Sequence, residues 1–552
     1  MDLGKQVIYQ IYPKSFYDSN GDGVGDLRGI IEKIPYIEKL NIDMIWFNPF
    51  YVSPQNDNGY DIANYYEIDP LFGTMSDFEE LVQKLKEINV GVMLDMVLNH
   101  CSTEHEWFQR ALAGEEKYQK YFYLRQAKED GSLPTNWQSK FGGPAWEKFG
   151  DTDLYYLHLY DKTQADLDWH HPEVRAELQN VVNFWQDKGV AGFRFDVINV
   201  IGKDEVLVDS KNPIQEKQLY TDTPIVHQYI HELNQASFGK NKNSITVGEM
   251  SSTTIENSIE YTKKENEELS MVFSFHHLKV DYKDGEKWSS MPFDFMKLKS
   301  LFNEWQTKMD QGGGWQALFW NNHDQPWALN RFGSVKHREK SATMLATALH
   351  LMQGTPYIYM GEEIGMVDPD YKAIDDYVDV ESINAYHNLL SQGKSKEEVL
   401  KIIHEKSRDN SRVPMHWDDS KYAGFSEGTP WLRPTDQEEI NVEKELKTGV
   451  IFDYYQQLIA LRKQEPLISQ GHFHPEDEEN NEVFAYRRYQ DGNGEALFVA
   501  CHFYDGETTV KVPDDFVGKK AEVMITNGDK KEFILEKELP LGSYEAVAFK
   551  MK

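Results

Sequence analysis

Short apolar segments alternate along most of the chain with stretches in which polar residues recur at helical spacing. Short apolar runs bounded by polar or glycine-containing segments are typical of buried strands, and their alternation with helices favours parallel βαβ units. Helical periodicity is clear at 78–89 and at 174–188. We therefore predict eight strands, at 7–12, 42–47, 90–97, 192–197, 245–250, 271–275, 317–320 and 357–360.

This alternation predicts an α/β fold, a (β/α)8 TIM barrel, over residues 1–103 and 170–472. The interval 104–169 is too long for one helix and is rich in Trp, Tyr, Gly and Asn, so we predict an inserted domain after the third strand. A second insertion, 366–450, follows the eighth strand. Short alternating segments over 473–552 predict a C-terminal antiparallel β domain, a β-sandwich.

The charge balance excludes several partners. The chain has 58 basic and 91 acidic residues, a net charge of −33, so its overall field repels nucleic acid and anionic membranes. No apolar run is long enough to span a bilayer. The amino terminus, Met1–Gln6, lacks the apolar core of a secretion signal, and two distant cysteines, Cys101 and Cys501, indicate no disulfide framework. We expect a cytoplasmic monomer.

Four of the predicted strands end in charged or amide side chains. The loops after the carboxyl ends of barrel strands build the active site, so charged residues there are typical of catalysis. They are three carboxylates, two histidines and an arginine: Asp196, Glu249, Asp324, His100, His323 and Arg194. A retaining glycosidase needs one carboxylate as nucleophile, a second carboxyl as proton donor, and polar groups that hold the sugar hydroxyls. The pattern therefore favours a glycoside hydrolase.

These strand ends resemble, in order and in residue type, the four signature regions of the α-amylase superfamily, glycoside hydrolase family 13. The segments are Asp95–His100, Gly192–Asp196, Ile245–Glu249 and Ala317–Asp324. Within the superfamily the chain resembles the oligo-1,6-glucosidase group, and there the branch that acts on phosphorylated trehalose. The segments that carry this closer resemblance are Gly248–Thr254, Phe273–Tyr282 with Gly285–Trp288, and Asn321–Pro326.

The resemblance implies a role for each carboxylate. Asp196 is the expected nucleophile, and Arg194, two residues earlier on the same face of a strand, is expected to hold it ionised. Glu249 is the expected general acid and base, with a pKa raised by burial and by a neighbouring carboxylate. Asp324 is expected to grip ring hydroxyls. The alternatives are a structural Arg194–Asp196 ion pair and a strand-end cap at Asp324.

Further residues match sugar-binding positions of the family. His100 and His323 are expected to donate hydrogen bonds to the reacting sugar, rather than to bind a metal. Tyr60 resembles the aromatic platform under the ring, Asp61 the group that holds the far hydroxyls, and Arg412 its basic partner. Together these residues would close the end of the pocket and give exo action. For Tyr60 simple packing, and for Arg412 a surface ion pair, remain open.

A glycine-rich loop near the amino terminus carries oxygen ligands at alternate positions. Its candidate ligands are Asp18, Asn20, Asp22, Val24 and Asp26. Such a set suits a hard cation, and the family resemblance implies a structural Ca²⁺, or Mg²⁺, away from the chemistry. Gly29 stands where an EF-hand would place its bidentate Glu, so the loop is not an EF-hand. The alternative is a metal-free loop of Asx turns. No cofactor is expected for catalysis.

The substrate expected from the resemblance is a phosphorylated disaccharide, α,α-trehalose 6-phosphate, cleaved with retention to glucose and glucose 6-phosphate. Because the net charge opposes an anion, a local basic pocket must bind the phosphate. Lys279 and Lys287 after the sixth strand are candidates for it, with solvated surface lysines as the alternative. One rival activity is that of an oligo-1,6-glucosidase or dextran glucosidase acting on isomalto-oligosaccharides. A non-catalytic amylase-like binding subunit is disfavoured because all three carboxylates are present.

Overall fold

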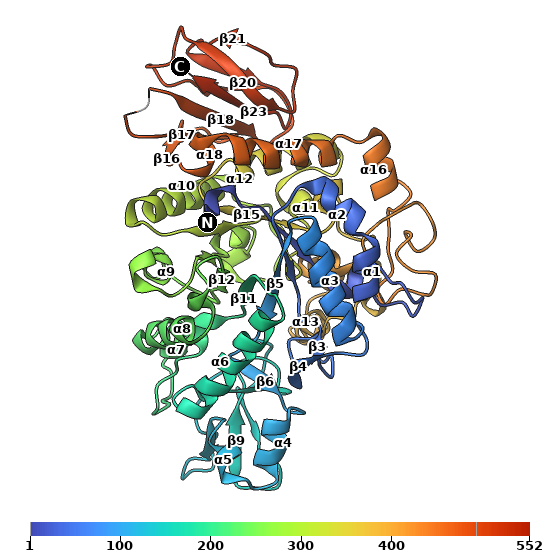
Figure 1. Ribbon diagram of the computed structural model, residues 1–552, viewed down its shortest axis with the longest axis vertical. Helices are drawn as coiled ribbons and strands as arrows, with labels where there is room; N and C mark the ends of the chain where they lie inside the picture. Colours follow the sequence, from blue (N-terminus) through green and yellow to red (C-terminus); the bar gives the residue numbers. More distant parts are fainter. Residues whose placement is uncertain (1, 493, 552) are drawn as a thin grey trace. The chain divides into compact units, whose positions relative to one another are not determined.

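The computed structural model describes residues 2–492 and 494–551, so the predicted domain limits at 1 and 552 lie outside the described residues (Figure 1). The predicted barrel is confirmed: eight parallel strands close in the order β1-β15-β14-β13-β12-β11-β5-β2. They are β1 (Ile8–Ile11), β2 (Met44–Phe47), β5 (Gly91–Met96), β11 (Gly192–Phe195), β12 (Ile245–Glu249), β13 (Met271–Phe273), β14 (Gln316–Leu318) and β15 (Thr355–Tyr359). Each lies within two residues of a predicted strand.

The strands are buried almost without interruption, as expected for parallel strands covered on both faces. The two predicted helices are present as α3 (Met75–Glu87) and α6 (Pro172–Asp187). A capping box between Thr74 and Asp77 begins α3, and a proline at the first turn begins α6, so both helices start where their sequences favour it.

The chain divides into two compact units. One comprises Met1–Ile45 and His276–Lys552, and the other Trp46–Phe275. Both units contribute strands to the barrel. This division does not test the predicted borders of the inserted domain and of the C-terminal domain, which stay a prediction.

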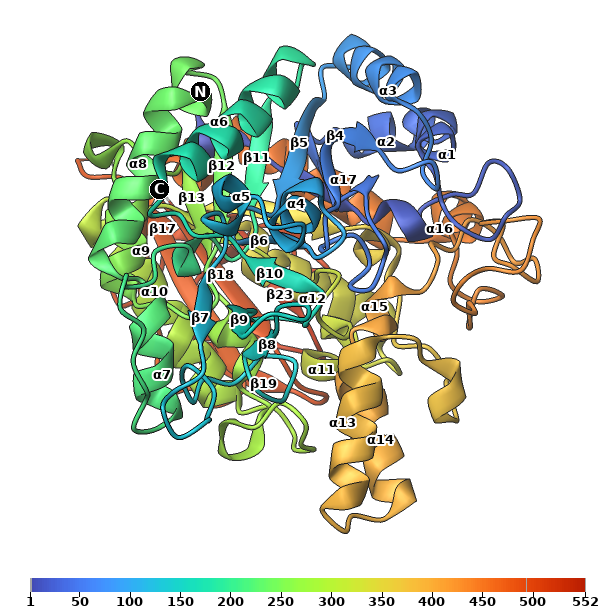
Figure 2. The same ribbon diagram turned by 90° about the horizontal axis from the view of Figure 1, so that it is seen from below.

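Within Trp46–Phe275, the segment predicted as an insertion, 104–169, forms one small sheet and shares a second with a short strand that precedes it (Figure 2). One has the order β7-β9-β8, and the other pairs β10 with β6. Their bounds are β6 (His100–Ser102), β7 (Leu124–Gln126), β8 (Trp146–Lys148), β9 (Leu154–Leu157) and β10 (Gln164–Asp166). A core that includes Tyr123, Trp137 and Trp146 also takes in Val200 and Tyr220, which follow β11. The insertion is thereby packed onto the chain that follows the strand of Arg194.

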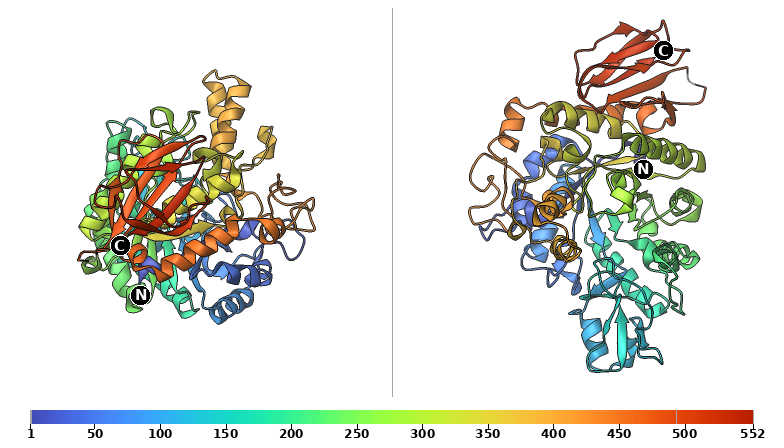
Figure 3. Two further views of the ribbon diagram at one scale, coloured as in Figure 1. Left: turned by 90° about the horizontal axis from the view of Figure 1, so that it is seen from above. Right: turned by 180° about the vertical axis from the view of Figure 1, so that it is seen from behind.

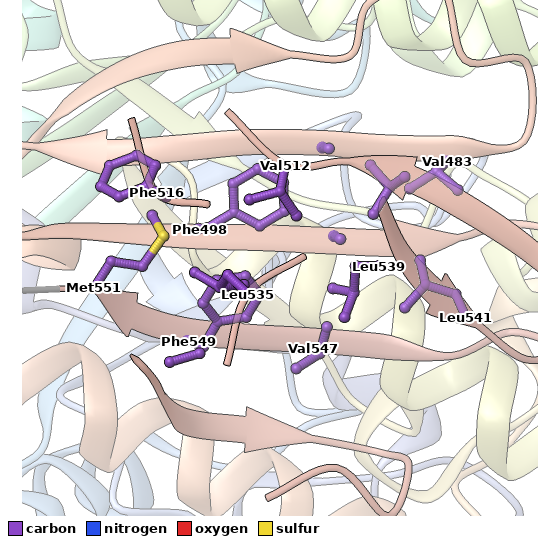
Figure 4. Packing of buried hydrophobic residues seen from close by; sticks show 14 of the residues in the cluster. Val483, Phe498, Val512, Phe516, Leu535, Leu539, Leu541, Val547, Phe549 and Met551 are labelled. Carbon is purple, nitrogen blue, oxygen red and sulfur yellow. The ribbon is translucent and has the colours of Figure 1, made fainter. Parts of the chain in front are cut away.

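In the other unit, the predicted C-terminal β region is an antiparallel sheet, drawn in red in Figure 3. Its strand order is β16-β17-β18-β23-β20-β21, and β19 pairs with β22 in a separate two-stranded sheet. The strands are β16 (His472–Glu476), β17 (Val483–Tyr489), β18 (Ala496–His502), β19 (Thr508–Lys511), β20 (Lys520–Thr526), β21 (Phe533–Ile534), β22 (Glu538–Leu541) and β23 (Ala546–Met551). Phe498, Phe549 and Leu539 lie in their common core (Figure 4).

The insertion after the eighth strand contains two helices, α13 (Val380–Ser391) and α14 (Lys396–Lys406), which pack side by side (Figure 2). Their apolar faces form one core with Tyr371, Tyr377 and Val413. A short helix, α15 (Asp409–Arg412), follows. None of the helices in the described part of the chain combines the length and apolar character that a bilayer crossing needs.

Candidate active site

Three carboxylates surround one buried guanidinium at the ends of β5, β11 and β12. Arg194 lies opposite Asp95 and Val247 in the strand register and is 1% exposed. Its Nη1 lies 2.8 Å from Asp95 Oδ1 and 2.6 Å from Asp196 Oδ1. Its Nη2 lies 2.7 Å from Glu249 Oε2. The predicted Arg194–Asp196 pair is therefore present, and it also joins the predicted acid and base, Glu249.

Asp95 is a member of this cluster that sequence reasoning missed. Its carboxylate accepts hydrogen bonds from Trp46 Nε1 at 3.1 Å and from the Tyr60 hydroxyl at 2.9 Å. The only signal in the sequence was its place within the first signature segment, Asp95–His100. Its contact with Arg194 gives the buried guanidinium a further anionic partner, which offsets the cost of removing that charge from water.

The chain is strained directly after Asp196. Val197 has φ 37° and ψ 40°, a left-handed conformation that is a true outlier for a β-branched residue. Such a conformation costs about 1–3 kcal/mol and persists where the surroundings enforce it. Here it brings the Val197 N–H within 3.3 Å of Glu249 Oε2. The backbone and Arg194 thus hold the same oxygen of Glu249.

Burial sets the ionisation of Asp196. Its removal from water raises its pKa to about 6, although the Arg194 guanidinium acts in the opposite direction and Asp95 adds to the rise. The pKa of Asp95 is raised to about 6 for the same reason, against the same guanidinium. Arg194 therefore favours the ionised form of Asp196, as expected, but burial opposes it. Asp196 is mainly ionised at pH 7, by a narrow margin.

The predicted sugar-binding residues Tyr60, Asp61 and His100 gather in the same unit. The Tyr60 hydroxyl bridges Asn48 Nδ2, at 2.8 Å, to the Asp95 carboxylate. His100 Nε2 lies 3.2 Å from the Tyr60 carbonyl oxygen, and burial lowers the His100 pKa to about 4, so its ring is neutral. The Asp61 carboxylate is fully buried and accepts hydrogen bonds from the loop that precedes it.

Asp324 stands in a second cluster, in the unit that contains β14. Arg412 Nη2 lies 2.8 Å from Asp324 Oδ1, and His323 Nε2 lies 3.2 Å from Oδ2. Arg412 Nε also donates to the His323 carbonyl at 2.8 Å, and Gln10 Nε2 lies 3.0 Å from His323 Nδ1. Arg412 is 1% exposed, so the alternative of a surface ion pair is wrong. The Asp324 side chain remains 28% exposed and open to a ligand.

Hydrogen bonds from residues that were not among the predicted site residues fix the segment that carries His323 and Asp324. Asn321 Nδ2 donates to Glu362 Oε2 at 2.7 Å, and its Oδ1 accepts from the Ala328 N–H at 2.7 Å, which closes the turn. Glu362 lines a cavity of about 20 Å³, and burial raises its pKa to about 7. Its second oxygen accepts from the Tyr455 hydroxyl at 2.7 Å.

The two predicted phosphate-binding lysines, Lys279 and Lys287, differ in their surroundings. Lys287 Nζ lies 2.7 and 2.9 Å from the two oxygens of Glu381, which also lies 3.3 Å from Arg408 Nε. Arg408, missed in the sequence, reaches Asp324 Oδ1 at 3.5 Å. Lys279 ends a short 3-10 helix and its side chain is exposed. A phosphate at Lys287 would have to compete with a carboxylate.

Known proteins resemble this chain over its whole length. Residues 10–471 match the alpha amylase catalytic domain. The chain belongs to the α-amylase family. It is 47% identical to trehalose-6-phosphate hydrolase of Bacillus subtilis (strain 168), over 99% of this chain and 98% of that protein. It is 42% identical to oligo-1,6-glucosidase of Bacillus cereus, over 99% of each. The crystal structure of Bacillus licheniformis trehalose-6-phosphate hydrolase, 48% identical, superposes with a TM-score of 0.95 over 100% of this chain and 99% of that one.

In this α-amylase family protein the predicted metal loop forms a series of Asx turns. The Asp18 carboxylate accepts from the Gly21 and Gly23 N–H groups, each at 2.8 Å. Asp26 caps the following helix through the Gly29 N–H at 2.7 Å. Among residues 2–492 and 494–551, no three His, Cys, Asp or Glu side chains are grouped as metal ligands. The metal on this loop stays a prediction.

Proposed function

We propose that this α-amylase family enzyme hydrolyses α,α-trehalose 6-phosphate to glucose and glucose 6-phosphate with retention. The observation that carries the proposal is the similarity to named trehalose-6-phosphate hydrolases. Besides the Bacillus subtilis relative, that of Escherichia coli (strain K12) is 49% identical over 90% of each chain. Both identities exceed the 42% to the oligo-1,6-glucosidase of Bacillus cereus.

Asp196 is the proposed nucleophile. Its carboxylate attacks the anomeric carbon as the bond to the bridging oxygen breaks, and Glu249 gives its proton to that oxygen, which leaves as glucose 6-phosphate. Glu249 then removes a proton from water, which attacks the glucosyl ester, frees Asp196 and yields glucose with the original configuration. The Arg194 guanidinium, 2.6 Å from Asp196, supports this role because it favours the ionised nucleophile.

The remaining predicted residues would hold the substrate. Asp324, bound by Arg412 and flanked by His323, would grip the ring hydroxyls, and His100 and Tyr60 would contact the same glucosyl unit. Asp61 would close the far end of the pocket and restrict cleavage to a terminal glucose. Lys279 and Lys287 would contribute positive charge for the phosphate; these roles remain part of the proposal.

No cofactor is proposed for the chemistry. We propose a structural Ca²⁺, or Mg²⁺, on Asp18, Asn20, Asp22, Asp26 and the Val24 carbonyl, because hard cations prefer oxygen ligands. A phosphorylated sugar does not cross a bilayer unaided, so we place the enzyme in the cytoplasm, where an imported and phosphorylated substrate would reach it. We propose that it acts as a monomer.

The second candidate is an oligo-1,6-glucosidase, favoured by the 42% identity to that enzyme over 99% of each chain. The two activities differ in the group that leaves, which is charged in one and neutral in the other. Purified enzyme should be compared on trehalose 6-phosphate, trehalose and isomaltose. The proposal expects the highest kcat/KM on trehalose 6-phosphate. A higher kcat/KM on isomaltose would assign the enzyme to the oligo-1,6-glucosidases.

A further inference from the structure

A lysine of the inserted segment lies beside the end of the strand that carries Glu249. Lys140 Nζ donates a hydrogen bond to the hydroxyl of Ser251, two residues after Glu249. The backbone holds this arrangement, because the Lys140 N–H donates to the Leu159 carbonyl at 2.8 Å and the Ser251 N–H donates to Asn199 Oδ1 at 2.9 Å. Hydrogen bonds therefore fix the backbone at both residues of this contact, which limits where the Lys140 ammonium can lie.

Tyr160 borders the same place. Among the described residues its buried hydroxyl makes no hydrogen bond of normal geometry, although it is close enough to the Ser251 side chain for that contact to lower its pKa. Burial, and then the charges of Asp196 and Glu249, raise its pKa, so the hydroxyl stays protonated. Its ring centroid is 5.6 Å from Lys140 Nζ and 5.8 Å from the Phe141 ring. A buried hydroxyl without a well-formed hydrogen bond is suited to a ligand, since leaving it poorly paired is costly.

We propose that Lys140, with the hydroxyls of Ser251 and Tyr160, forms the subsite of the leaving group, and that Lys140 binds its phosphate. The inference rests on the proposed function. The group that leaves is the one that Glu249 protonates, so it must lie next to Glu249. A phosphate brought near two carboxylates requires a cation on the same side, and Lys140 supplies one at the end of β12 (Gly248 and Glu249 are its last residues).

The surroundings of Lys140 differ from those of Lys287, the lysine first considered for the phosphate. The Lys287 ammonium is bound by both oxygens of Glu381, and a phosphate would have to displace that carboxylate. The Ser251 hydroxyl bound by Lys140 is neutral, and it can itself donate to a phosphate oxygen.

The test is a comparison of Lys140→Met with Lys148→Met. Both variants remove one positive charge from the inserted segment, and both lysines lie over tyrosine rings, Lys148 at 5.0 Å from Tyr155. Initial rates are measured on trehalose 6-phosphate, trehalose and an aryl α-glucoside. Lys140→Met should lower kcat/KM on trehalose 6-phosphate by about 10- to 100-fold, mainly through KM. Its loss on the two neutral substrates should be at least about tenfold smaller, and Lys148→Met should match the unaltered enzyme.

Inhibition of aryl glucoside hydrolysis by glucose 6-phosphate and by glucose provides a second measurement. Lys140→Met should weaken inhibition by glucose 6-phosphate and not that by glucose, and Lys140→Arg should restore part of it. Equal losses on charged and neutral substrates, or an unchanged rate on trehalose 6-phosphate, would overturn the subsite alone. If the unaltered enzyme does not prefer trehalose 6-phosphate to trehalose, the proposed function itself fails, and this inference with it.

Discussion

Replacement of Arg194 by Met tests the electrostatics of the carboxylate cluster. The Met side chain keeps much of the apolar stem but removes the guanidinium, which lies 2.6–2.8 Å from three carboxylates. A charge pair at about 4 Å is worth about 4 kcal/mol at an effective dielectric of about 20. Since one pKa unit corresponds to about 1.4 kcal/mol, even one third of that attraction would raise the Asp196 pKa from about 6 to about 7.

The expected result is a shift in the pH profile. Asp196 must be ionised to attack, so the acid limb of kcat/KM should lie near pH 6 in the unaltered enzyme and at least about one unit higher in Arg194→Met. Arg194→Lys keeps a charge but cannot reach three carboxylates at once, so its limb should shift less. The assay is hydrolysis of an aryl α-glucoside from about pH 5 to 9.

Stability gives an independent measurement. Removal of one partner from a buried ion pair costs about 3–5 kcal/mol, so the Tm of Arg194→Met should fall. The folded-state pKa values of Asp95 and Asp196 are raised, so the folded protein binds protons more tightly than the unfolded chain. The stability that these two carboxyls contribute is therefore fully present below their unfolded-state pKa and is lost as the pH rises through their folded-state pKa. This window is about pH 4–6 in the unaltered enzyme, and its upper limit should move to higher pH in Arg194→Met.

The control is Arg175→Met. Arg175 lies on α6, pairs with Glu232 at 2.9 Å and is partly exposed. It should leave the acid limb in place, although its Tm should also fall, because the Arg175 side chain is only 16% exposed and also donates to the Trp169 and His170 carbonyls. An acid limb that stays at its original pH in Arg194→Met, in protein shown to be folded, would refute the view that this guanidinium sets the charge of Asp196.

Three further predictions concern the covalent step, the metal loop and the lysines. Asp196→Asn should abolish turnover, and Glu249→Gln should slow the hydrolysis of substrates with poor leaving groups more than that of aryl glucosides. NMR should detect α-glucose as the first product, and initial β-glucose would contradict retention. If the Asp18–Asp26 loop holds Ca²⁺ or Mg²⁺, chelation should lower the Tm and leave low-temperature activity nearly intact, whereas metal-free protein with an unchanged Tm in chelator would count against it. If Lys279 or Lys287, and not Lys140, binds the phosphate, its replacement by Ala should cost about 10- to 100-fold in kcat/KM on trehalose 6-phosphate and little on an aryl α-glucoside, and equal losses would make that lysine structural.

The positions of the barrel strands and of the signature carboxylates were accessible from the sequence. Buried parallel strands need continuous apolar runs, so each run marks a strand within a few residues. A strand also alternates its side chains, which is why Arg194 and Asp196 were expected on one face and form a pair at 2.6 Å. Asp196, Glu249 and Asp324 were expected from their places after predicted strands together with the resemblance to the family. Strand positions and the face on which a side chain lies depend on the order of neighbouring residues, which can be read from the sequence.

Only the tertiary structure decided the partners and the charge of these groups. Arg194 is shared with Asp95, which lies 99 residues earlier, and Lys140 meets Ser251 across 111 residues. Lys287 is bound by Glu381, 94 residues away. Such contacts arise when the barrel closes and insertions fold back, so no local pattern reveals them. The pKa of a carboxylate likewise depends on the water excluded by distant residues, and the same Asp can be ionised or neutral at pH 7 according to that burial.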